Sequence, residues 1–367
     1  MQNTHKKICI VTISLAKGGA ERSCAMLSEM LYAEGYEVHI AILNNEIDYH
    51  YKGTLFNLGN RKKPKENIAT RTKRLLKLRK YLKKNKIDLI IDHRTKNDYY
   101  RELFYHNVLY KGFKKIYVVH SANTNLYLTK QPKKFAKEYS LNVATVGVSD
   151  YISKEILPQY RIHNAVTIHN AFDPSWATSE AIVAPELKPH NYILSYGRID
   201  DTVKDFTFLI NAFTASNLWK DGVQLAILGN GPDKEMLQQF VASLPSHNQI
   251  VFLPQQNPFP IVSKAQFVTL TSRFEGFPMV LVEALSLSVP VVSLDIVSGP
   301  SEIIEHRKNG LLVAKRNVSL FAEALLEMHN NDILREFCKA NSKASVSQFS
   351  ISEISKKWNQ ILQHAVR

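Results

Sequence analysis

The chain has 367 residues, of which 45% are hydrophobic and 22% are charged. That length suggests two domains, each with room for a hydrophobic core, and the composition excludes a disordered chain. The net charge of +14 is concentrated in the N-terminal half, because residues 1–175 hold 30 Lys and Arg against 15 Asp and Glu. Any anionic partner is therefore expected to meet that half.

The sequence indicates neither a disulfide framework nor a membrane-spanning segment. Cys9, Cys24 and Cys338 lie in apolar segments and form no CxxC pair, which is typical of buried thiols in a reducing cytoplasm. The apolar run at 8–15 is too short to span a bilayer and lacks a small-residue cleavage site. We expect a cytoplasmic protein that is not integral to the membrane.

The first predicted unit is a strand at 6–14, a loop containing Gly18 and Gly19, and a helix with Leu27 and Leu31 on one face. Glycines at this place would let the backbone approach a phosphate or a sugar closely. A simple tight turn is the alternative. The loop lacks the GxGxxG spacing of a dinucleotide site.

A strongly basic stretch follows the second predicted strand. Between Arg61 and Lys86 there are 13 Lys or Arg and one acidic residue. Within it, a helical core face is predicted at Ile68, Leu75, Leu78 and Leu82. The cations suit a solvated helix face or an anionic membrane surface. Nucleic acid is the weakest interpretation, because few aromatic residues interleave with the cations, and we expect no nucleic-acid partner.

Polar residues follow two further predicted strands of the first sheet. The strand at 87–92 ends in Asp92, His93 and Arg94, and the strand at 115–119 ends in His120. The carboxyl ends of parallel strands form the ligand edge of an open α/β sheet. Asp92, His93 and Arg94 are therefore candidates for an acceptor site, with local capping as the alternative. A lone histidine such as His120 is more often structural.

Prolines and polar residues break the periodicity between Pro174 and Pro189, and a second α/β series begins at Tyr192. We expect an N-terminal domain at 1–173, a C-terminal domain at 174–350 and a final helix at 351–367. Strands alternate with helices in both halves, which predicts two parallel sheets.

The second series places cations beside a strand end. Gly197 and Arg198 follow the strand that begins at Tyr192, and Lys204 is predicted in the first turn of the next helix. Arginine offers a planar fork and lysine a point charge, and both suit phosphate oxygens. Gly229 opens a Gly-Asn-Gly-Pro turn after the next strand, and that turn also lacks the third glycine of a dinucleotide site.

The stretch 270–304 is the most informative. Its helix is apolar on almost every side except for Glu283, and a buried carboxylate requires hydrogen-bond donors, so Glu283 is expected to face a polar ligand. Pro278 suits the first helical position, and the preceding Glu275, Gly276 and Phe277 would present backbone N–H groups to an anion. Gly299 lies in a similar loop, one α/β unit later.

Glu275 and Glu283, eight residues apart in EGFPMVLVEAL and followed by GPSEII, resemble the signature of glycosyltransferase family 4. Members of that family are retaining, nucleotide-sugar-dependent enzymes. The resemblance implies the GT-B fold, with two Rossmann-like doubly wound domains facing each other across a cleft. It also implies that 1–173 binds the acceptor, that 174–350 binds the nucleotide sugar, and that the helix at 351–367 crosses back to the N-terminal domain.

The resemblance also implies roles for single residues. Arg198 and Lys204 would grip the donor diphosphate, Glu283 would accept hydrogen bonds from the ribose, and Glu275 would hold sugar hydroxyls without acting as a covalent nucleophile. His120 would lie near the donor sugar and the acceptor. The loops expected around the donor contain Gly18, Gly19, Gly197, Gly229, Gly276, Phe277, Pro278 and Gly299.

We therefore expect transfer of a hexose from a UDP-sugar to a hydroxyl of a glycan or lipid-linked acceptor, in surface polysaccharide or lipopolysaccharide synthesis. No cofactor or metal is expected, because the sequence contains no DxD motif and two cations serve the diphosphate. The enzyme would work in the cytoplasm, docked on the inner face of the membrane. The alternatives are another GT-B-like enzyme, such as an epimerase or a pyridoxal-phosphate phosphorylase, and a non-catalytic protein that binds anions or membranes.

Overall fold

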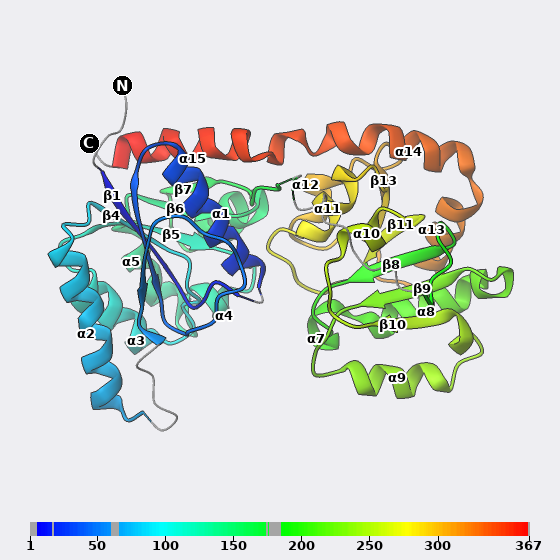
Figure 1. The fold of residues 1–367 in the computed structure, drawn as a ribbon, viewed down its shortest axis with the longest axis horizontal. Helices are drawn as coiled ribbons and strands as arrows, with labels where there is room; N and C mark the ends of the chain where they lie inside the picture. The colour runs from blue at the N-terminus through cyan, green and yellow to red at the C-terminus, as the bar shows by residue number, and fades with distance from the viewer. Residues whose placement is uncertain (1–5, 17, 60–65, 174, 176–184, 366–367) are drawn as a thin grey trace. The chain divides into compact units, whose positions relative to one another are not determined.

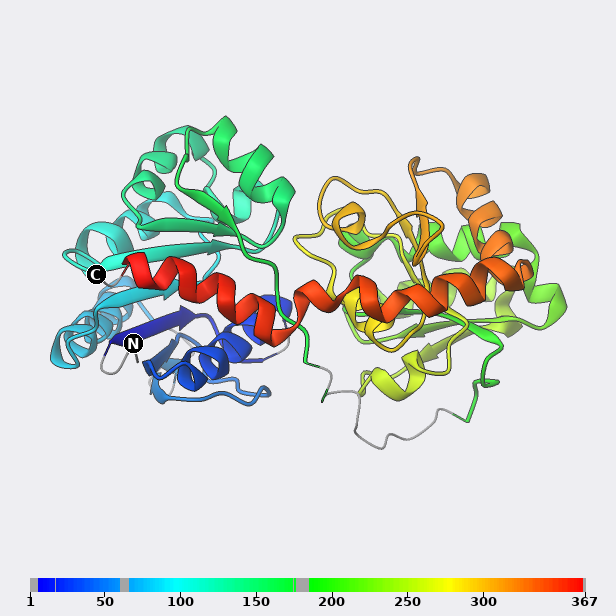
Figure 2. The ribbon, with the colours of Figure 1, turned by 90° about the horizontal axis from the view of Figure 1, so that it is seen from above.

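The computed structural model describes residues 6–16, 18–59, 66–173, 175 and 185–365. The chain forms two compact units, one made of Met1–Ala171 with Ile351–Arg367 and the other of Phe172–Ser350. Each unit is a parallel β-sheet with helices packed against it (Figures 1 and 2).

The first unit contains a seven-stranded parallel sheet in the order β3-β2-β1-β4-β5-β6-β7. Its central strands are fully buried and rich in Val and Ile, as expected for strands covered on both faces. The strands are β1 (Lys7–Thr12), β2 (Glu37–Ile42), β3 (Thr54–Asn57), β4 (Leu89–Asp92), β5 (Lys114–Val119), β6 (Ala144–Gly147) and β7 (Ala165–Thr167).

The longer helices of this unit bury one apolar face each. They are α1 (Gly19–Ala33), α2 (Ile68–Lys84), α3 (Tyr99–Phe104), α4 (Thr124–Tyr127), α5 (Pro132–Ser140), α6 (Leu157–Gln159) and α15 (Ile351–Ala365), with π-helical turns η2 (Tyr105–Leu109) and η3 (Tyr151–Ile156). The final helix α15 packs beside α1, where the Ser355 hydroxyl donates to Glu34 at 3.0 Å (Figure 2).

Helix α2 confirms most of the predicted core face in the basic stretch. Leu75, Leu78 and Leu82 are buried, but Ile68 is 85% exposed, so its prediction as a core residue is wrong. Ile68 is the first residue of α2, directly after the N-cap Asn67, which accepts a hydrogen bond from the Thr70 N–H. Ile68 therefore lies in the exposed first turn, ahead of the buried residues of α2.

The second unit contains a six-stranded parallel sheet in the order β10-β9-β8-β11-β12-β13. Its strands are β8 (Tyr192–Tyr196), β9 (Gln224–Leu228), β10 (Ile250–Leu253), β11 (Phe267–Leu270), β12 (Val291–Leu294) and β13 (Gly310–Val313). One core cluster joins this sheet to the helices around it, with Phe213, Phe267 and Phe321 fully buried.

The helices of the second unit vary widely in length. They are α7 (Asp201–Lys204), α8 (Phe206–Ser216), α9 (Lys234–Ala242), α10 (Phe259–Val262), α11 (Met279–Ser286), α12 (Pro300–Ile303), α13 (Val318–Asn330) and α14 (Asp332–Ser345), with 3-10 turns η5 (Leu218–Asp221), η6 (His247–Gln249) and η7 (Ser347–Phe349). Within the part of the chain described, no helix is both long and apolar enough to cross a membrane.

The two sheets share one topology. In each, the strand order reverses beside the first strand, between β1 and β4 in one unit and between β8 and β11 in the other. Ligands of doubly wound sheets bind at the carboxyl ends of the strands around such switch points. Both units therefore present the loops that contain the predicted site residues at the expected edge.

Candidate active site

In the second unit, the loop after β8 presents two cations. The Arg198 side chain is 71% exposed, with its guanidinium 3.4 Å from the Asp200 carboxylate. Lys204 is the last residue of the one-turn helix α7 and lies before the longer helix α8, so its prediction at the start of a helix is wrong. The reason is Asp205, whose left-handed backbone (φ 52°) ends α7 before α8 begins.

Lys204 forms an ion pair with Glu275, from the loop after β11. The ammonium lies 2.5 Å from Oε1 of Glu275, and the Ser272 hydroxyl donates to the same oxygen at 2.7 Å. Both side chains of the pair are largely buried, at 21% and 14% exposure. The second oxygen, Oε2, accepts no hydrogen bond from the described residues, so it remains available to a hydroxyl group of a ligand.

Arg316 ties these two loops together. Its guanidinium donates to the carboxylate of Asp205 at 2.5 Å and to the backbone carbonyls of Thr271 and Ser272 at 3.0 and 2.6 Å. Those residues directly follow Lys204 and precede Glu275 in the chain. Arg316 therefore fixes the distance between the loops, a role that sequence reasoning missed because Arg316 follows β13, far from either motif.

Glu283 lies on α11 and is buried, at 2% exposure. The Tyr196 hydroxyl donates to its carboxylate at 2.7 Å, from the end of β8. Sequence reasoning expected Glu283 to face a polar ligand and did not single out Tyr196 as a hydrogen-bond donor from within the chain. Helix α11 is apolar around this carboxylate, as predicted, and Pro278 immediately precedes its first residue.

Close contacts hold the loop before α11 against the loop before α12. Gly299 has φ 99°, and a Cβ atom there would lie 2.3 Å from Cδ of Pro278. The Ser298 hydroxyl donates to the carbonyl of Gly276 at 2.9 Å. Phe277, the residue after Gly276, is buried. A side chain at position 299 would therefore push apart two loops that the sequence predicts to border the donor.

The glycines after β8 and β9 also touch each other. A Cβ atom on Gly229 would lie 1.9 Å from the carbonyl oxygen of Gly197, and the Gly197 N–H donates to Leu228 O at 3.0 Å. The close packing of these two strand ends is by itself enough to require glycine at position 229. A Cβ on Gly197 would approach the Lys204 side chain at 3.9 Å, which places this contact beside the cations.

Gly18 and Gly19 begin α1 at the switch point of the first unit. Neither has a left-handed backbone, and a Cβ on Gly19 would meet no atom within 4 Å. A Cβ on Gly18 would meet only the movable carboxylate of Glu21. Local geometry therefore does not require glycine at position 19, which weighs against a simple tight turn.

His93 and His120 form a hydrogen-bonded pair at the ends of β4 and β5. Nδ1 of His93 lies 2.9 Å from Nε2 of His120. Burial, followed by the charge of Lys96, lowers the pKa of His120 to about 3. Burial, His120 and Lys96 also hold the pKa of His93 well below its usual value. Both rings are therefore neutral near pH 7.

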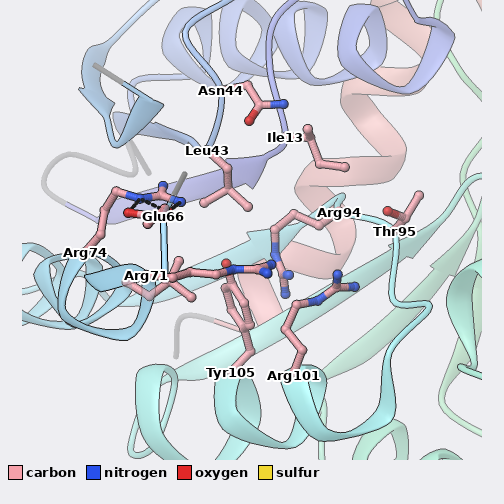
Figure 3. Close-up of a pocket in the computed structure, with 11 residues that line it drawn as sticks. Ile13, Leu43, Asn44, Glu66, Arg71, Arg74, Arg94, Thr95, Arg101 and Tyr105 are labelled. Carbon is pink, nitrogen blue, oxygen red and sulfur yellow. Dashed lines mark hydrogen bonds and ion pairs between the residues drawn. The ribbon is translucent and has the colours of Figure 1, made fainter. Parts of the chain in front are cut away.

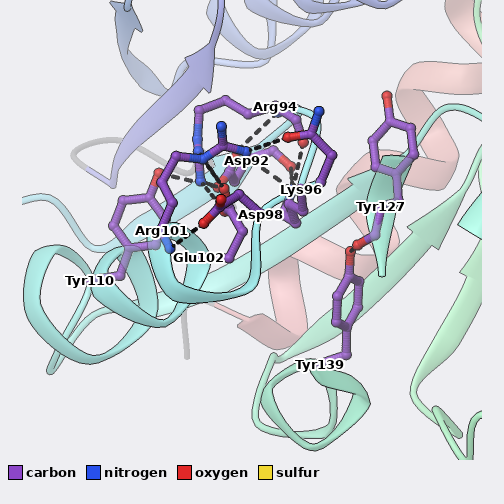
Figure 4. A network of polar contacts seen from close by, with 10 residues as sticks. Asp92, Arg94, Lys96, Asp98, Arg101, Glu102, Tyr110, Tyr127 and Tyr139 are labelled. Atoms are coloured by element: carbon purple, nitrogen blue, oxygen red, sulfur yellow. Dashed lines mark hydrogen bonds and ion pairs between the residues drawn. The ribbon is translucent and has the colours of Figure 1, made fainter. Parts of the chain in front are cut away.

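Asp92 and Arg94 belong to a buried ionic network (Figure 4). The Arg94 guanidinium donates to Asp92 at 2.7 Å and to Glu102 at 3.0 Å, and Lys96 lies 3.7 Å from Asp92. Burial raises the pKa of Asp92, but the charges of Arg94 and Lys96 outweigh burial and lower it overall. The Asp92 carboxylate is thus held as a permanent anion inside the unit, and Arg94 caps it locally.

Two family models match the chain and together span most of it. Residues 17–176 match the model described as Glycosyltransferase Family 4, and residues 179–345 match the model described as Glycosyl transferases group 1. The chain is a family 4 glycosyltransferase. The resemblance based on Glu275, Glu283 and the motif between them is confirmed.

Named relatives of this glycosyltransferase include two bacterial enzymes. The N-acetylgalactosamine-N,N'-diacetylbacillosaminyl-diphospho-undecaprenol 4-alpha-N-acetylgalactosaminyltransferase of Campylobacter jejuni is 27% identical over 364 residues, covering 96% of this chain and 98% of the relative. The lipopolysaccharide 1,6-galactosyltransferase of Escherichia coli is 32% identical over 247 residues, covering 63% of this chain and 66% of the relative.

Solved structures identify the fold of this glycosyltransferase. A crystal structure of S. aureus TarM that contains UDP superposes with a TM-score of 0.77 at 16% identity, covering 97% of this chain and 99% of that chain. At that identity the likeness concerns the fold alone. It confirms the predicted GT-B class, with two parallel-sheet α/β domains.

Proposed function

We propose that this glycosyltransferase transfers a hexose, with retention of configuration, from a UDP-sugar to a hydroxyl of a glycan or lipid-linked acceptor during surface polysaccharide or lipopolysaccharide synthesis. The Lys204–Glu275 ion pair carries the proposal, because it places a phosphate-binding cation beside a carboxylate with one oxygen still available. The names of the two relatives, which transfer galactose or N-acetylgalactosamine, support a hexose and this class of acceptor. The UDP in the TarM structure supports the nucleotide.

In the proposed reaction, Arg198 and Lys204 stabilise the negative charge that develops on the leaving diphosphate. Preorganised cations aimed at developing charge are among the largest contributions to catalysis. Oε2 of Glu275 accepts a hydrogen bond from a hydroxyl of the donor sugar and so orients the reacting carbon. The acceptor hydroxyl then attacks from the side of the departing diphosphate, as the bond from the sugar carbon to the diphosphate breaks. The diphosphate oxygen that leaves takes the hydroxyl proton, and the configuration is retained.

Glu283 is assigned to the ribose of the nucleotide. Its carboxylate is oriented by the Tyr196 hydroxyl, so it is positioned before the nucleotide arrives. With two cations serving the diphosphate, the proposed reaction requires neither a metal ion nor a cofactor. The family matches do not favour an epimerase, a phosphorylase or a non-catalytic binding protein.

We also propose that the outer face of α2 docks on the anionic inner surface of the membrane. Lys80, Lys83 and Lys84 lie on this face beside Leu76, whose side chain is partly exposed. Each well-placed cation contributes about 1 kcal/mol of attraction to an anionic bilayer. Arg79 is excluded from this role, because its guanidinium donates to the backbone carbonyls of the segment after α3.

The proposal is tested by incubating the purified protein with UDP-glucose, UDP-galactose or their N-acetyl forms, and a lipid-linked saccharide acceptor. We expect a transfer product whose anomeric configuration, read from the one-bond and vicinal couplings of the new anomeric proton, matches that of the donor. An inverted product would exclude the same-side attack. If free sugar or an epimer of the donor forms as fast without acceptor as with it, hydrolysis or epimerisation of the donor is favoured over transfer.

A further inference from the structure

The first unit contains a pocket of about 380 Å³ that is strongly cationic. We name it the arginine pocket after four of its lining residues, Arg71, Arg74, Arg94 and Arg101, which α2, the loop after β4 and α3 contribute. Among the described residues that line it, Glu66 is the one that is acidic. Figure 3 shows the guanidinium groups of Arg71, Arg94 and Arg101 directed toward the middle of the pocket.

The positive charge around this pocket is not balanced by the described residues. Glu66 neutralises Arg74 through a two-pronged ion pair, with N–O distances of 2.9 Å. Glu102 is shared between Arg94 and Arg101, while Asp92 is shared between Arg94 and Lys96. Arg71 forms no side-chain hydrogen bond or ion pair with the rest of the described chain. Among the described residues, two carboxylates therefore serve three cations here, and Arg71 is left without a counter-ion.

Buried donors also lack partners here. Arg94 is 2% exposed, and its Nε has no hydrogen-bond acceptor among the described residues. The same holds for Nη1 of the buried Arg74. Unpaired buried donors are costly, and a guanidinium pays more than a neutral group. Both donor atoms have almost no accessible surface, so an anion in the pocket would offset the excess charge of this network rather than bond to these two atoms directly.

The arrangement is rigid enough to select a ligand. The guanidinium of Arg94 stacks on the Tyr105 ring at 3.4 Å from its centroid, and Asp92 and Glu102 fix its plane. Arg101 is held by Glu102 at 2.7 Å and by Asn97 at 2.8 Å. Planar forks fixed in this way match the oxygens of phosphate groups. A single carboxylate would leave more than one of the cations without a counter-ion.

We propose that the arginine pocket binds the phosphate or diphosphate group of an anionic acceptor substrate. This inference rests on the proposed function, because it supplies the anionic part of the acceptor for the transferase reaction. It gives the glycosyltransferase two separate phosphate sites, one for the donor around Arg198 and Lys204, and one for the acceptor in the first unit.

The test uses the full chain in the Arg198→Ala/Lys204→Ala background, in which the donor diphosphate site is disabled. Inorganic pyrophosphate and geranyl diphosphate are titrated calorimetrically into this protein. Arg71→Ala is then added, since Arg71 is exposed and its loss leaves the buried network intact. Lys77→Ala is the matched control, because it removes the same charge from the exposed face of α2 without lining the pocket.

We expect pyrophosphate to bind the donor-disabled protein, Arg71→Ala to weaken binding about tenfold or more, and Lys77→Ala to change it less than twofold. Tighter binding of geranyl diphosphate than of pyrophosphate would identify a lipid diphosphate as the acceptor group. Equal binding of the two would identify a water-soluble phosphate, and both results support the pocket. Galacturonate, an anion with one carboxylate, is titrated as a comparison. Absence of pyrophosphate binding, equal losses in the two variants, or galacturonate binding as tight as that of pyrophosphate would overturn the proposal.

A separate titration of UDP distinguishes the two claims. The tightest UDP site should have the same affinity in wild type and in Arg71→Ala, because the arginine pocket does not contain the donor residues. Failure of UDP to bind wild type would contradict the proposed donor site while leaving the pyrophosphate result intact. Loss of pyrophosphate binding with normal UDP binding would overturn the acceptor pocket alone.

Discussion

Replacing Lys204 by alanine removes the ammonium 2.5 Å from Glu275 and the charge assigned to the leaving diphosphate. Two unit charges 4 Å apart attract by about 4 kcal/mol at an effective dielectric constant of 20, a value suited to a partly buried pair. Losing one preorganised contact of this kind typically costs about 2.7–4 kcal/mol in the transition state. We therefore expect Lys204→Ala to lower kcat by about 10²–10³.

The assay compares initial rates of sugar transfer at saturating donor for wild type, Lys204→Ala, Glu275→Ala and the double variant. Because Lys204 and Glu275 are in contact, the double variant should lose much less than the product of the single losses. Lys343→Ala, on the exposed side of α14 in the same unit, is the matched control. Single variants within twofold of wild type, or losses that multiply fully, would refute the reasoning.

Three further predictions follow from the geometry. Tyr196→Phe should weaken UDP binding about 5- to 30-fold by calorimetry, because Glu283 loses the hydroxyl that orients it; unchanged affinity would exclude that positioning role. Acidification should destabilise the first unit between about pH 6.5 and pH 3, since His93 and His120 stay neutral when folded but gain protons when unfolded. The free energy of unfolding, measured by urea denaturation, should therefore fall as the pH is lowered through this range. His120→Gln should reduce the slope of that fall by at most about 1.4 kcal/mol per pH unit, and an unaltered slope would contradict the low pKa. Raising NaCl from 0.1 to 0.5 M should release the protein from phosphatidylserine vesicles in a sedimentation assay; binding unchanged by salt would refute electrostatic docking of α2.

Periodicity and strand-end chemistry predicted much of this molecule. Alternating buried strands and amphipathic helices indicated two parallel sheets, and the motif around Glu275 and Glu283 indicated the family. The prediction failed where the local signal was weak, because it includes no strand at the position of β3. Strand β3 is four residues long at the sheet edge and half-buried, so it has no buried apolar run to mark it.

Other features depend on contacts that no sequence pattern reveals. The left-handed backbone at Asp205 ends α7 at Lys204, and aspartate does not mark such a position uniquely. Arg316 reaches the site from a loop 41 residues beyond Glu275, so only the fold brings them together.

The arginine pocket was likewise hidden in the sequence. Arg71 and Arg74 belong to a basic stretch whose pattern predicts a solvated or membrane-facing helix, whereas Arg94 is predicted at a strand end as an acceptor-site candidate without any link to that helix. The parallel pairing of β4 with β1 and the packing of α2 place them around one cavity. Neither segment alone carries a signal for an anion site.

The proposed reaction depends most directly on a nucleoside diphosphate that the second unit binds without a metal. The decisive measurement is a thermal-shift titration of UDP, with NAD as a comparison, in the presence of EDTA, for wild type and Arg198→Ala. At about 100 times its dissociation constant, UDP should stabilise wild type by about 2.7 kcal/mol, a shift of several degrees, and Arg198→Ala should lose most of that shift. A shift with NAD alone, or an equal UDP shift in both proteins, would contradict the assigned donor site.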